Sequence, residues 1–281
     1  MNIKITSDST CDLSPELIAA QNISIVPLTV VMGGKNYRDA IDVVPADIFA
    51  FVGAGHGFCS TAAVNIAEYE QFFGQFSADY DAVVHICLGA GFSSCYQNAC
   101  IAAADFPNVH VVDSQNLSTG HGHIVLEAAR RAADCTDAGA LSDALRELAG
   151  RVEASFLLDK LDYMVKGGRC SAVAALGANL LRLKPCIEVA DGKMKVVKKY
   201  RGSYAKCIAD YVDERLCGRG DIVEDTIFIT HTPVDDGIVE LVKDRVAHSG
   251  KQFSEIYQTQ AGCTVSCHCG PGTLGVLFIR K

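Results

Sequence analysis

Residues 81–105 constrain the fold more than any other stretch of the chain. The first eight are apolar enough to predict a short buried strand, and a glycine-rich turn then interrupts the strand. Ser93 and Ser94 are residue types that begin helices, and the alanine-rich run after them predicts a helix. A strand that passes through a glycine turn into a helix is typical of an open α/β sheet, whose ligands bind beyond the strand ends.

The same stretch predicts an anion site. The free N–H groups at the start of the helix, the helix dipole and the hydroxyl of Ser93 would point to one place and favour negative charge there. The alternative is an ordinary connection from strand to helix with a capping serine. The turn has neither a phosphate-loop nor a full dinucleotide-binding pattern, so these residues alone leave both interpretations open.

The order of predicted elements indicates an α/β protein with two domains. Strands and helices alternate through residues 1–152, which favours an α/β/α domain with a parallel sheet covered on both faces. Hairpins are mixed with helices in residues 153–281, where Asp191 and Gly192 form a strong hairpin turn. This second part is predicted to be an α+β domain with a mostly antiparallel sheet.

Three local predictions bear on the site. Ser60 and Thr61 are placed on a loop before a helix, where such a pair most often acts as a cap. An Ala/Leu-rich helix is expected over residues 171–181. One cysteine cluster is predicted to lie on a strand. Neighbouring side chains of a strand point to opposite faces, so the members of the cluster would be poor joint ligands for a metal ion. This cluster consists of Cys263, Cys267, His268 and Cys269.

Composition excludes several classes of partner. The formal net charge of −8, with no basic run, argues against nucleic acid. No apolar run approaches the roughly 20 residues that span a bilayer, so stable membrane insertion is not expected. The first residues are too polar for a signal peptide, and the 13 scattered cysteines suit a reducing compartment. We therefore expect a cytoplasmic protein.

Other polar groups are candidates for ligand binding. His268 precedes Gly270 and Gly272 in a tight loop that lets a ligand approach the backbone, although a lone histidine is more often structural. Arg169 lies between a predicted helix end and the next helix start, where the alternative is a surface arginine beside a C-terminal cap. Arg201 ends a basic strand segment, for which the alternative is a solvated face.

A serine-dependent esterase or acyltransferase is the rival prediction. Ser93 or Ser94 would be the nucleophile, His268 the base and Asp8 the group that orients the base. The G-x-S-x-G elbow, the ATP-binding phosphate loop and the H-E-x-x-H metal motif are all absent from the sequence. The residues therefore offer anion-binding groups without an obvious catalytic motif. A regulatory module that responds to another small anion is a further alternative.

Short motifs recur along the chain in a fixed order, and their joint spacing is more specific than any one of them. On these motifs the chain resembles, nearly end to end, the DegV family of bacterial fatty-acid-binding proteins. The motifs are residues 6–10, 12–14, 26–30, 37–39, 92–97, 112–114, 167–169, 183–185, 191–192, 201–202 and 268–272.

The resemblance implies two α/β domains with a long-chain fatty acid between or within them. Hydroxyl groups would hold the carboxylate, and an apolar tunnel would hold the acyl chain. A separate fatty acid kinase would phosphorylate the bound carboxylate to an acyl phosphate that feeds lipid synthesis. The chain would then be a carrier without enzymatic activity, with no cofactor and no metal, and the fatty acid would be its ligand.

The resemblance also implies roles for individual residues. Thr61 and Ser93, with Ser94 beside them, match hydroxyl positions of the carboxylate site. The chain departs from the family pattern at residues 62–64, which replace Ser-Gln-Pro, and at 89–91, where many members carry serines. Second-line donors are expected at His268, Gly270 and Gly272, and groups facing the kinase or the acyl phosphate at Arg169 and Arg201.

Overall fold

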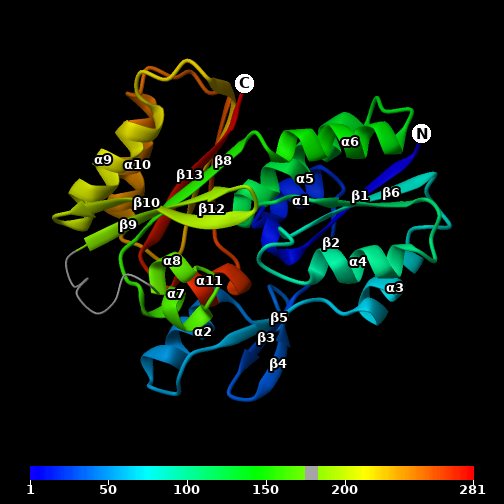
Figure 1. The fold of residues 1–281 in the computed structure, drawn as a ribbon, viewed down its shortest axis with the longest axis horizontal. Coiled ribbons are helices and arrows are strands. Elements are labelled where there is room, and N and C mark those ends of the chain that lie inside the picture. The colour runs from blue at the N-terminus through cyan, green and yellow to red at the C-terminus, as the bar shows by residue number, and fades with distance from the viewer. Residues whose placement is uncertain (175–182) are drawn as a thin grey trace.

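A parallel four-stranded sheet with the order β2-β1-β6-β7 organises the first half of the chain in the computed structural model, which describes residues 1–174 and 183–281 (Figure 1). All six residues of β6 are buried, as expected for a parallel strand covered on both faces. Its strands are β1 (Ile3–Asp8), β2 (Ser24–Val26), β6 (Ala82–Cys87) and β7 (Val109–Asp113).

Helices cover both faces of this sheet. In Figure 1, α3 and α4 lie on one side of the strands, whereas α5 and α6 lie on the other. The short elements η1 (Ser9–Cys11) and α1 (Pro15–Ala20) follow β1. The covering helices are α3 (Ile66–Gly74), α4 (Cys95–Ala103), α5 (Ser118–Ala132) and α6 (Ala138–Ala149).

A six-stranded sheet with the order β10-β9-β8-β13-β11-β12 organises the second half. Every neighbouring pair is antiparallel except β11 and β12, so the predicted fold class is confirmed. Helices α9 (Tyr204–Leu216) and α10 (Asp236–Ala247) cover its outer face. The strands are β8 (Val152–Leu158), β9 (Leu183–Ala190), β10 (Lys193–Arg201), β11 (Ile222–His231), β12 (Glu255–Gln260) and β13 (Thr273–Arg280).

Helix α5 joins the two sheets into one apolar core. It contacts β1 and β6 of the first sheet and also β8, β11 and β13 of the second. Apolar residues of the second sheet, among them Ala154, Phe228 and Leu277, belong to the same buried cluster as Ile5 and Ile86. Strand β8 begins at Val152, but the division into separate domains near residue 152 stays a prediction.

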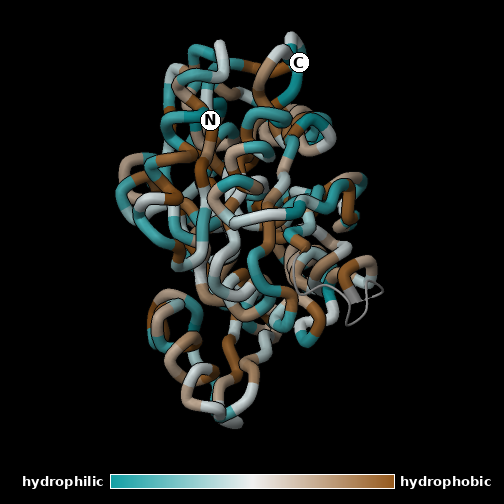
Figure 2. The backbone as a smooth tube through the Cα atoms, turned by 90° about the vertical axis from the view of Figure 1, so that its left-hand side faces the viewer, coloured by the Kyte–Doolittle hydropathy of each residue, from teal (hydrophilic) through white to brown (hydrophobic). Residues whose placement is uncertain are grey.

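A third, antiparallel sheet with the order β4-β3-β5 lies in a separate lobe at the bottom of Figures 1 and 2. Gly33 and Gly34 are a hairpin signal in the sequence, and they join β3 to β4. The predicted loop position of Ser60 and Thr61 is wrong, because both lie in β5. Asn65 caps α3 instead, with its Oδ1 accepting from Glu68 N at 3.0 Å. The elements are β3 (Thr29–Met32), β4 (Lys35–Arg38), β5 (Ser60–Ala62) and α2 (Pro45–Gly53).

The cysteine cluster is helical, contrary to the strand assumed for it. It forms α11 (Cys263–Cys269), whose first N–H groups bind side chains from the first half of the chain. Two further short helices, α7 (Asp162–Gly167) and α8 (Ser171–Ala174), lie beside α11 in Figure 1. The rest of the helix expected over residues 171–181 lies outside the described residues.

Neither a metal-binding group nor a membrane-spanning helix is present in residues 1–174 and 183–281. No group of three or more His, Cys, Asp or Glu residues in residues 1–174 and 183–281 is arranged to hold a metal ion. Within the same ranges, no helix combines the length and the apolar character that crossing a bilayer requires.

Candidate functional site

The turn between β6 and α4 places Ser93, and two glycines allow its close packing. A Cβ atom on Gly89 would lie 2.9 Å from Asn116 N, and one on Gly91 would lie 2.1 Å from Gly192 O at the tip of the β9–β10 hairpin. The turn is therefore fixed between the loop before α5 and that hairpin. Ser93 Oγ accepts from Cys95 N at 3.2 Å, which caps the helix start, and donates to Cys95 Sγ at 3.2 Å.

Thr61 reaches the same place from the third sheet. It pairs with Val30 in β3, and its Oγ1 lies 2.9 Å from His268 Nε2 on α11. Burial and, less strongly, the positive charge of Arg169 lower the pKa of His268 to about 4, so the ring is neutral at pH 7. A Cβ on Gly167 would lie 2.4 Å from His268 Nδ1, so a side chain there would push the ring out of place.

These groups line one end of a cavity of about 60 Å³ between the two halves of the chain. Its polar residues are Thr10, Thr61, Ser93, Arg169, Thr264 and His268, and none of the residues that line it is acidic. Arg169 is exposed, and Thr61, Ser93 and His268 are half-buried, so this end faces the surface. The apolar residues of the wall are Leu28, Ala63, Leu88, Phe92, Leu117, Met164, Met194, Val265 and Cys269.

A second cavity of about 30 Å³ continues the first inward. The two share Leu117, Val265 and Cys269, all of them buried, and the second extends towards the six-stranded sheet. Its wall is mixed: it includes apolar residues such as Phe156 and Leu277 and the polar residues Ser118, Thr230, His231, Thr232 and Thr273. One water molecule occupies about 30 Å³ in the liquid. A long acyl chain therefore fits only if side chains along this path move apart. The unbranched Met164 and Met194 are suited to such repacking.

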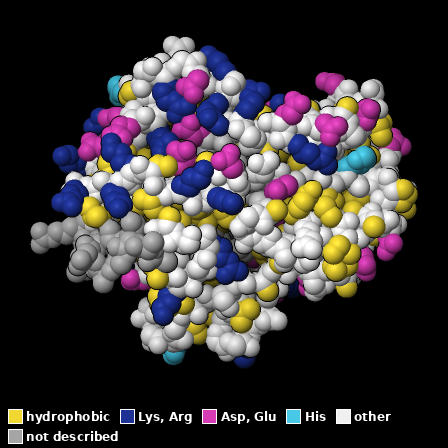
Figure 3. Space-filling view, in the orientation of Figure 1, with side chains coloured by type: hydrophobic (Ala, Val, Ile, Leu, Met, Phe, Trp, Pro, Cys, Tyr) yellow, Lys and Arg dark blue, Asp and Glu magenta, His cyan; other side chains and the backbone are white. Residues whose placement is uncertain are grey.

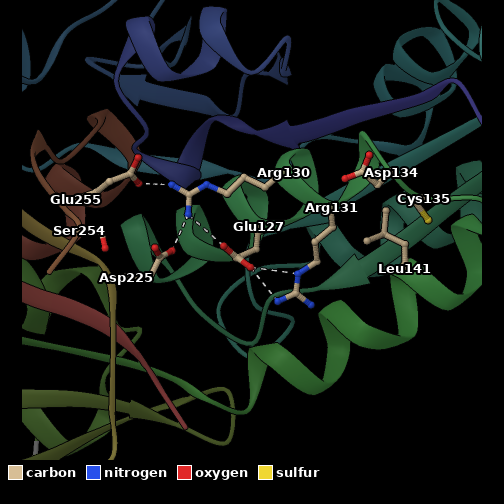
Figure 4. Close-up of a pocket in the computed structure, with 9 residues that line it drawn as sticks. All are labelled: Glu127, Arg130, Arg131, Asp134, Cys135, Leu141, Asp225, Ser254 and Glu255. Atoms are coloured by element: carbon tan, nitrogen blue, oxygen red, sulfur yellow. Dashed lines mark hydrogen bonds and ion pairs between the residues drawn. The ribbon is translucent and has the colours of Figure 1, made fainter.

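A different hollow, of about 710 Å³, lies beside α5 (Figure 4). Charged side chains line it: Arg130 pairs with Glu127, Asp225 and Glu255. The pairing sets positive charge against negative charge, and six of the nine residues that line the hollow are Arg, Asp or Glu, so it suits a hydrocarbon less well than the first cavity does. It lies near the far end of α5, about 18 Å from Ser118 at 1.5 Å per residue.

The structure brings together four of the predicted site residues, Thr61, Ser93, Arg169 and His268. The remaining four, Ser94, Arg201, Gly270 and Gly272, do not line the cavity. Ser94 is exposed at the start of α4 and its side chain makes no capping bond. Arg201 is exposed at the end of β10.

The two loop glycines have a packing role that differs from the expected one. Gly270 N donates to Ser266 O at 3.0 Å and Gly272 N donates to Pro233 O at 3.0 Å, so neither N–H is free to act as a second-line donor. Both residues have positive φ, and a Cβ on Gly270 would lie 2.6 Å from the ring of Tyr163. Glycine is therefore needed here for the turn and the close approach.

The relay required by the rival hydrolase prediction is not assembled. His268 bonds to Thr61, whereas Ser93 bonds to Cys95. The Asp8 carboxylate accepts from Leu88 N at 2.7 Å and lies 3.8 Å from His121 Nδ1, so Asp8 orients no base beside Ser93. This arrangement suits binding of an anion better than activation of a serine.

Sequence reasoning missed several residues that line the cavity. Thr10 follows β1, which is the parallel neighbour of β6, so its carboxyl-terminal end lies at the same sheet edge as Ser93. The motif at residues 6–10 was the available signal for it. Thr264 and Met194 had no such signal, because only tertiary packing brings α11 and the β9–β10 hairpin to this edge.

Comparison with known proteins identifies a family and relatives of known structure. The family model described as an uncharacterised protein of the DegV family matches residues 2–281. A DegV domain-containing protein of Caldanaerobacter subterraneus subsp. tengcongensis is 30% identical over 281 residues, which cover 99% of each chain. A solved structure described as fatty acid binding of a DegV family protein from Thermus thermophilus covers 100% of both chains, with a TM-score of 0.91 and 27% identity.

A second solved structure is described as a fatty acid (stearic acid)-binding protein from Eubacterium ventriosum. It has a TM-score of 0.84 and 25% identity, and the match covers 99% of this chain and 98% of that one. The match of the family model over nearly the whole length, with a relative of 30% identity over 99% of both chains, shows that this chain belongs to the DegV family.

Proposed function

We propose that this protein is a carrier that binds one long-chain fatty acid and presents its carboxylate to a kinase. The observation that carries the proposal is the cavity that Thr61, Ser93, His268 and Arg169 line together with nine apolar residues. The solved relatives from Thermus thermophilus and Eubacterium ventriosum, described as fatty-acid-binding, support the ligand class.

The outer end suits a carboxylate because it offers donors and no competing negative charge. When Nε2 of the neutral His268 carries the proton, it donates to Thr61 Oγ1, and the hydroxyl proton of Thr61 is then free for the ligand. Ser93 would exchange its bond to Cys95 Sγ, a weak acceptor, for a bond to the carboxylate. Each hydrogen bond to a charged group contributes about 1.5–3 kcal/mol.

The acyl chain would supply most of the affinity. Each buried methylene contributes about 0.8 kcal/mol, so a chain of about fourteen offers roughly 11 kcal/mol before the costs of ordering the ligand and opening the cavity. The chain would run inward past Leu117 and Val265, since Arg169 is exposed and Thr61, Ser93 and His268 are half-buried, whereas Leu117 and Val265 are buried. The hydroxyls would set orientation and the preference for a carboxylate.

The kinase step rests on the family resemblance and on exposed arginines. The sequence has no phosphate loop, so ATP binding through that motif is not expected of this chain. Lys and Arg side chains over β9, β10 and α9 are interspersed with Asp and Glu on the face in Figure 3, and Lys198 pairs with Glu214. Arg169 and Arg201 are both exposed, and exposed arginines suit a partner that carries nucleotide phosphates. The test is acyl-phosphate formation from the bound fatty acid on addition of a fatty acid kinase and ATP.

Binding is tested on the purified full chain. Mass spectrometry of denatured protein should release a fatty acid from the expression host, and affinity for added carboxylates of 10 to 18 carbons should increase with each methylene. Ser93→Ala and Thr61→Ala should each weaken binding by about 10- to 100-fold, which corresponds to the loss of one charge-assisted bond. Calorimetric titration of delipidated protein measures these affinities.

Ser94→Ala is the matched control, because Ser94 is adjacent, exposed and outside the cavity. It should bind fatty acid as tightly as the unmodified chain. The absence of any released lipid, together with no uptake of added fatty acid, would contradict the proposal. Hydrolysis of acyl esters that disappears in Ser93→Ala would favour the esterase instead.

A further inference from the structure

Helix α11 is capped by side chains that are more than 200 positions away in the sequence. Its N-cap residue is Gly262, which has no side chain to accept a hydrogen bond. Gly262 N instead donates to Asp12 Oδ1 at 2.9 Å, and Cys263 N and Thr264 N donate to the two oxygens of Asp39 at 3.0 and 3.2 Å. Two residues of the first half therefore hold the start of a helix in the second half.

Asp39 is the better bonded of these two side chains. It also accepts from Thr264 Oγ1 at 2.6 Å and from Ser9 Oγ at 3.0 Å, and only 2% of its surface is exposed. A buried carboxylate is stable when it has several donors and lies at the positive end of a helix dipole. Burial chiefly, with the nearby Asp39 in addition, raises the pKa of Asp12. Asp39 accepts from two helix N–H groups and Asp12 from one.

The same helix forms much of the wall of the fatty-acid cavity. Thr264, Val265, His268 and Cys269 all line the cavity, and His268 contacts Thr61. Asp39 itself does not line it. A helix of two turns moves as one piece, so a displacement at its start changes the distance between His268 and Thr61 at its end.

We propose that Asp39 is a positioning residue for the carboxylate half of the site, which holds α11 against the first half of the chain and keeps His268 next to Thr61. This inference rests on the proposed function, because it concerns how tightly a fatty acid is bound. It also gives a role to the motif at residues 37–39, which includes Asp39 but does not line the cavity.

Asp39→Asn tests this inference, because it keeps the size of the side chain and replaces one acceptor oxygen with an NH₂ group. That group would face the N–H of Cys263 or Thr264, so one helix donor loses its partner and the charge at the dipole is lost. We expect affinity to fall by about fivefold or more, by the same factor for fatty acids of 12, 14 and 16 carbons. A defect in the tail cavity would instead change with chain length.

Asp137→Asn is the matched control. Asp137 also accepts from two helix N–H groups, those of Gly139 and Ala140, but it caps α6, which does not line the cavity. Its Oδ1 alone accepts both bonds and an amide oxygen can keep them, so Asp137→Asn should change the melting temperature little and leave fatty-acid affinity unchanged. The ring resonances of His268 in an NMR spectrum, assigned with His268→Gln, provide a readout without lipid. They should shift in Asp39→Asn and stay in place in Asp137→Asn.

The inference is overturned if Asp39→Asn lowers only the melting temperature and leaves both the affinity and the His268 resonances unchanged. Failure of the unmodified chain to bind fatty acid would refute the proposed function, whereas the resonance shift would still test the role of Asp39. If Asp39→Asn does not fold, Ser9→Ala removes one donor to Asp39 and should shift the same resonances by less. Unshifted resonances in a folded Ser9→Ala would equally overturn the inference.

Discussion

At the scale of single residues, burial shifts the titration of several groups in opposite directions. Burial lowers the pKa of His85 to about 3 and those of His123 and His268 to about 4, against 6.5 for the free side chain. Burial raises the pKa of Asp12 from 3.8 to about 8, although hydrogen bonds from Ser118 and Gly262 act against this shift. These shifts make the free energy of unfolding depend on pH.

The sign of that dependence changes near pH 6.5. Below it, the unfolded chain binds protons on three histidines that the folded chain excludes, so stability falls as pH decreases towards 4. Asp12 acts oppositely: its stabilising contribution is complete below about pH 3.8 and is lost as pH rises to about 8. These histidines, together with His121, whose pKa burial also lowers, outweigh Asp12 in acid, and the contribution of Asp12 prevails towards pH 8, so we expect maximal stability near pH 6.5.

Urea unfolding between pH 4.5 and 8 measures this profile. Asp12→Asn should remove the decline between pH 6.5 and 8 and keep the decline in acid. A stability that continues to rise to pH 8 in the unmodified chain would contradict the assignment of a raised pKa to Asp12.

At the scale of elements, the tip of the β9–β10 hairpin closes on the turn that carries Ser93. The contact is between backbones, since a Cβ on Gly91 would lie 2.1 Å from Gly192 O. Met194, two residues beyond the hairpin tip, lines the same cavity as Ser93. The position of the hairpin therefore determines how well the outer end of the site is closed.

Gly91→Ala should separate the hairpin from the turn, because backbone atoms cannot yield as a flexible side chain can. We expect it to cost about 1–3 kcal/mol of stability and to weaken fatty-acid binding. Gly53→Ala is the control, since a Cβ there meets nothing within 4 Å and the residue ends a helix with ordinary φ. Thermal melting and calorimetric titration compare the two, and equal behaviour would show that the hairpin contact is unimportant.

At the scale of the whole molecule, ion pairs at one end of α5 join the two halves away from the proposed site. Arg130 on α5 pairs with Asp225 in β11 and Glu255 in β12, and 27% of its side chain is exposed (Figure 4). Exposed ion pairs contribute little individually, but this arginine serves three carboxylates. The network therefore adds to the apolar core that both sheets share with α5.

Arg130→Met should lower stability by about 1 kcal/mol, and the difference from the unmodified chain should shrink in 1 M salt because mobile ions screen exposed charges. Fatty-acid affinity should stay unchanged, since the network lies about 18 Å along α5 from the cavity. Urea unfolding at low and high salt measures the first effect. A large loss of affinity would show that the two ends of α5 are coupled.

The sequence by itself determined the features that depend on local chemistry. Hydrophobic runs and turn residues predicted the parallel sheet around β6, the β9–β10 hairpin and the helix after Ser93, because strand and helix periodicity and turn geometry act over a few residues. The motif order correctly indicated the DegV family. The sequence also predicts four ligand-binding residues that the structure places at one cavity: Thr61, Ser93, Arg169 and His268.

Only the tertiary structure decided how distant segments meet. Thr61 became part of a strand because β3, some thirty residues earlier, offers it a partner, and no local signal reveals that pairing. The first N–H groups of helix α11 bind Asp39, which is more than 200 positions away in the sequence. The N–H of Gly270 is not free because it donates to Ser266 O. Local propensity cannot specify such contacts, since their free energy exists only after the chain has brought both partners together.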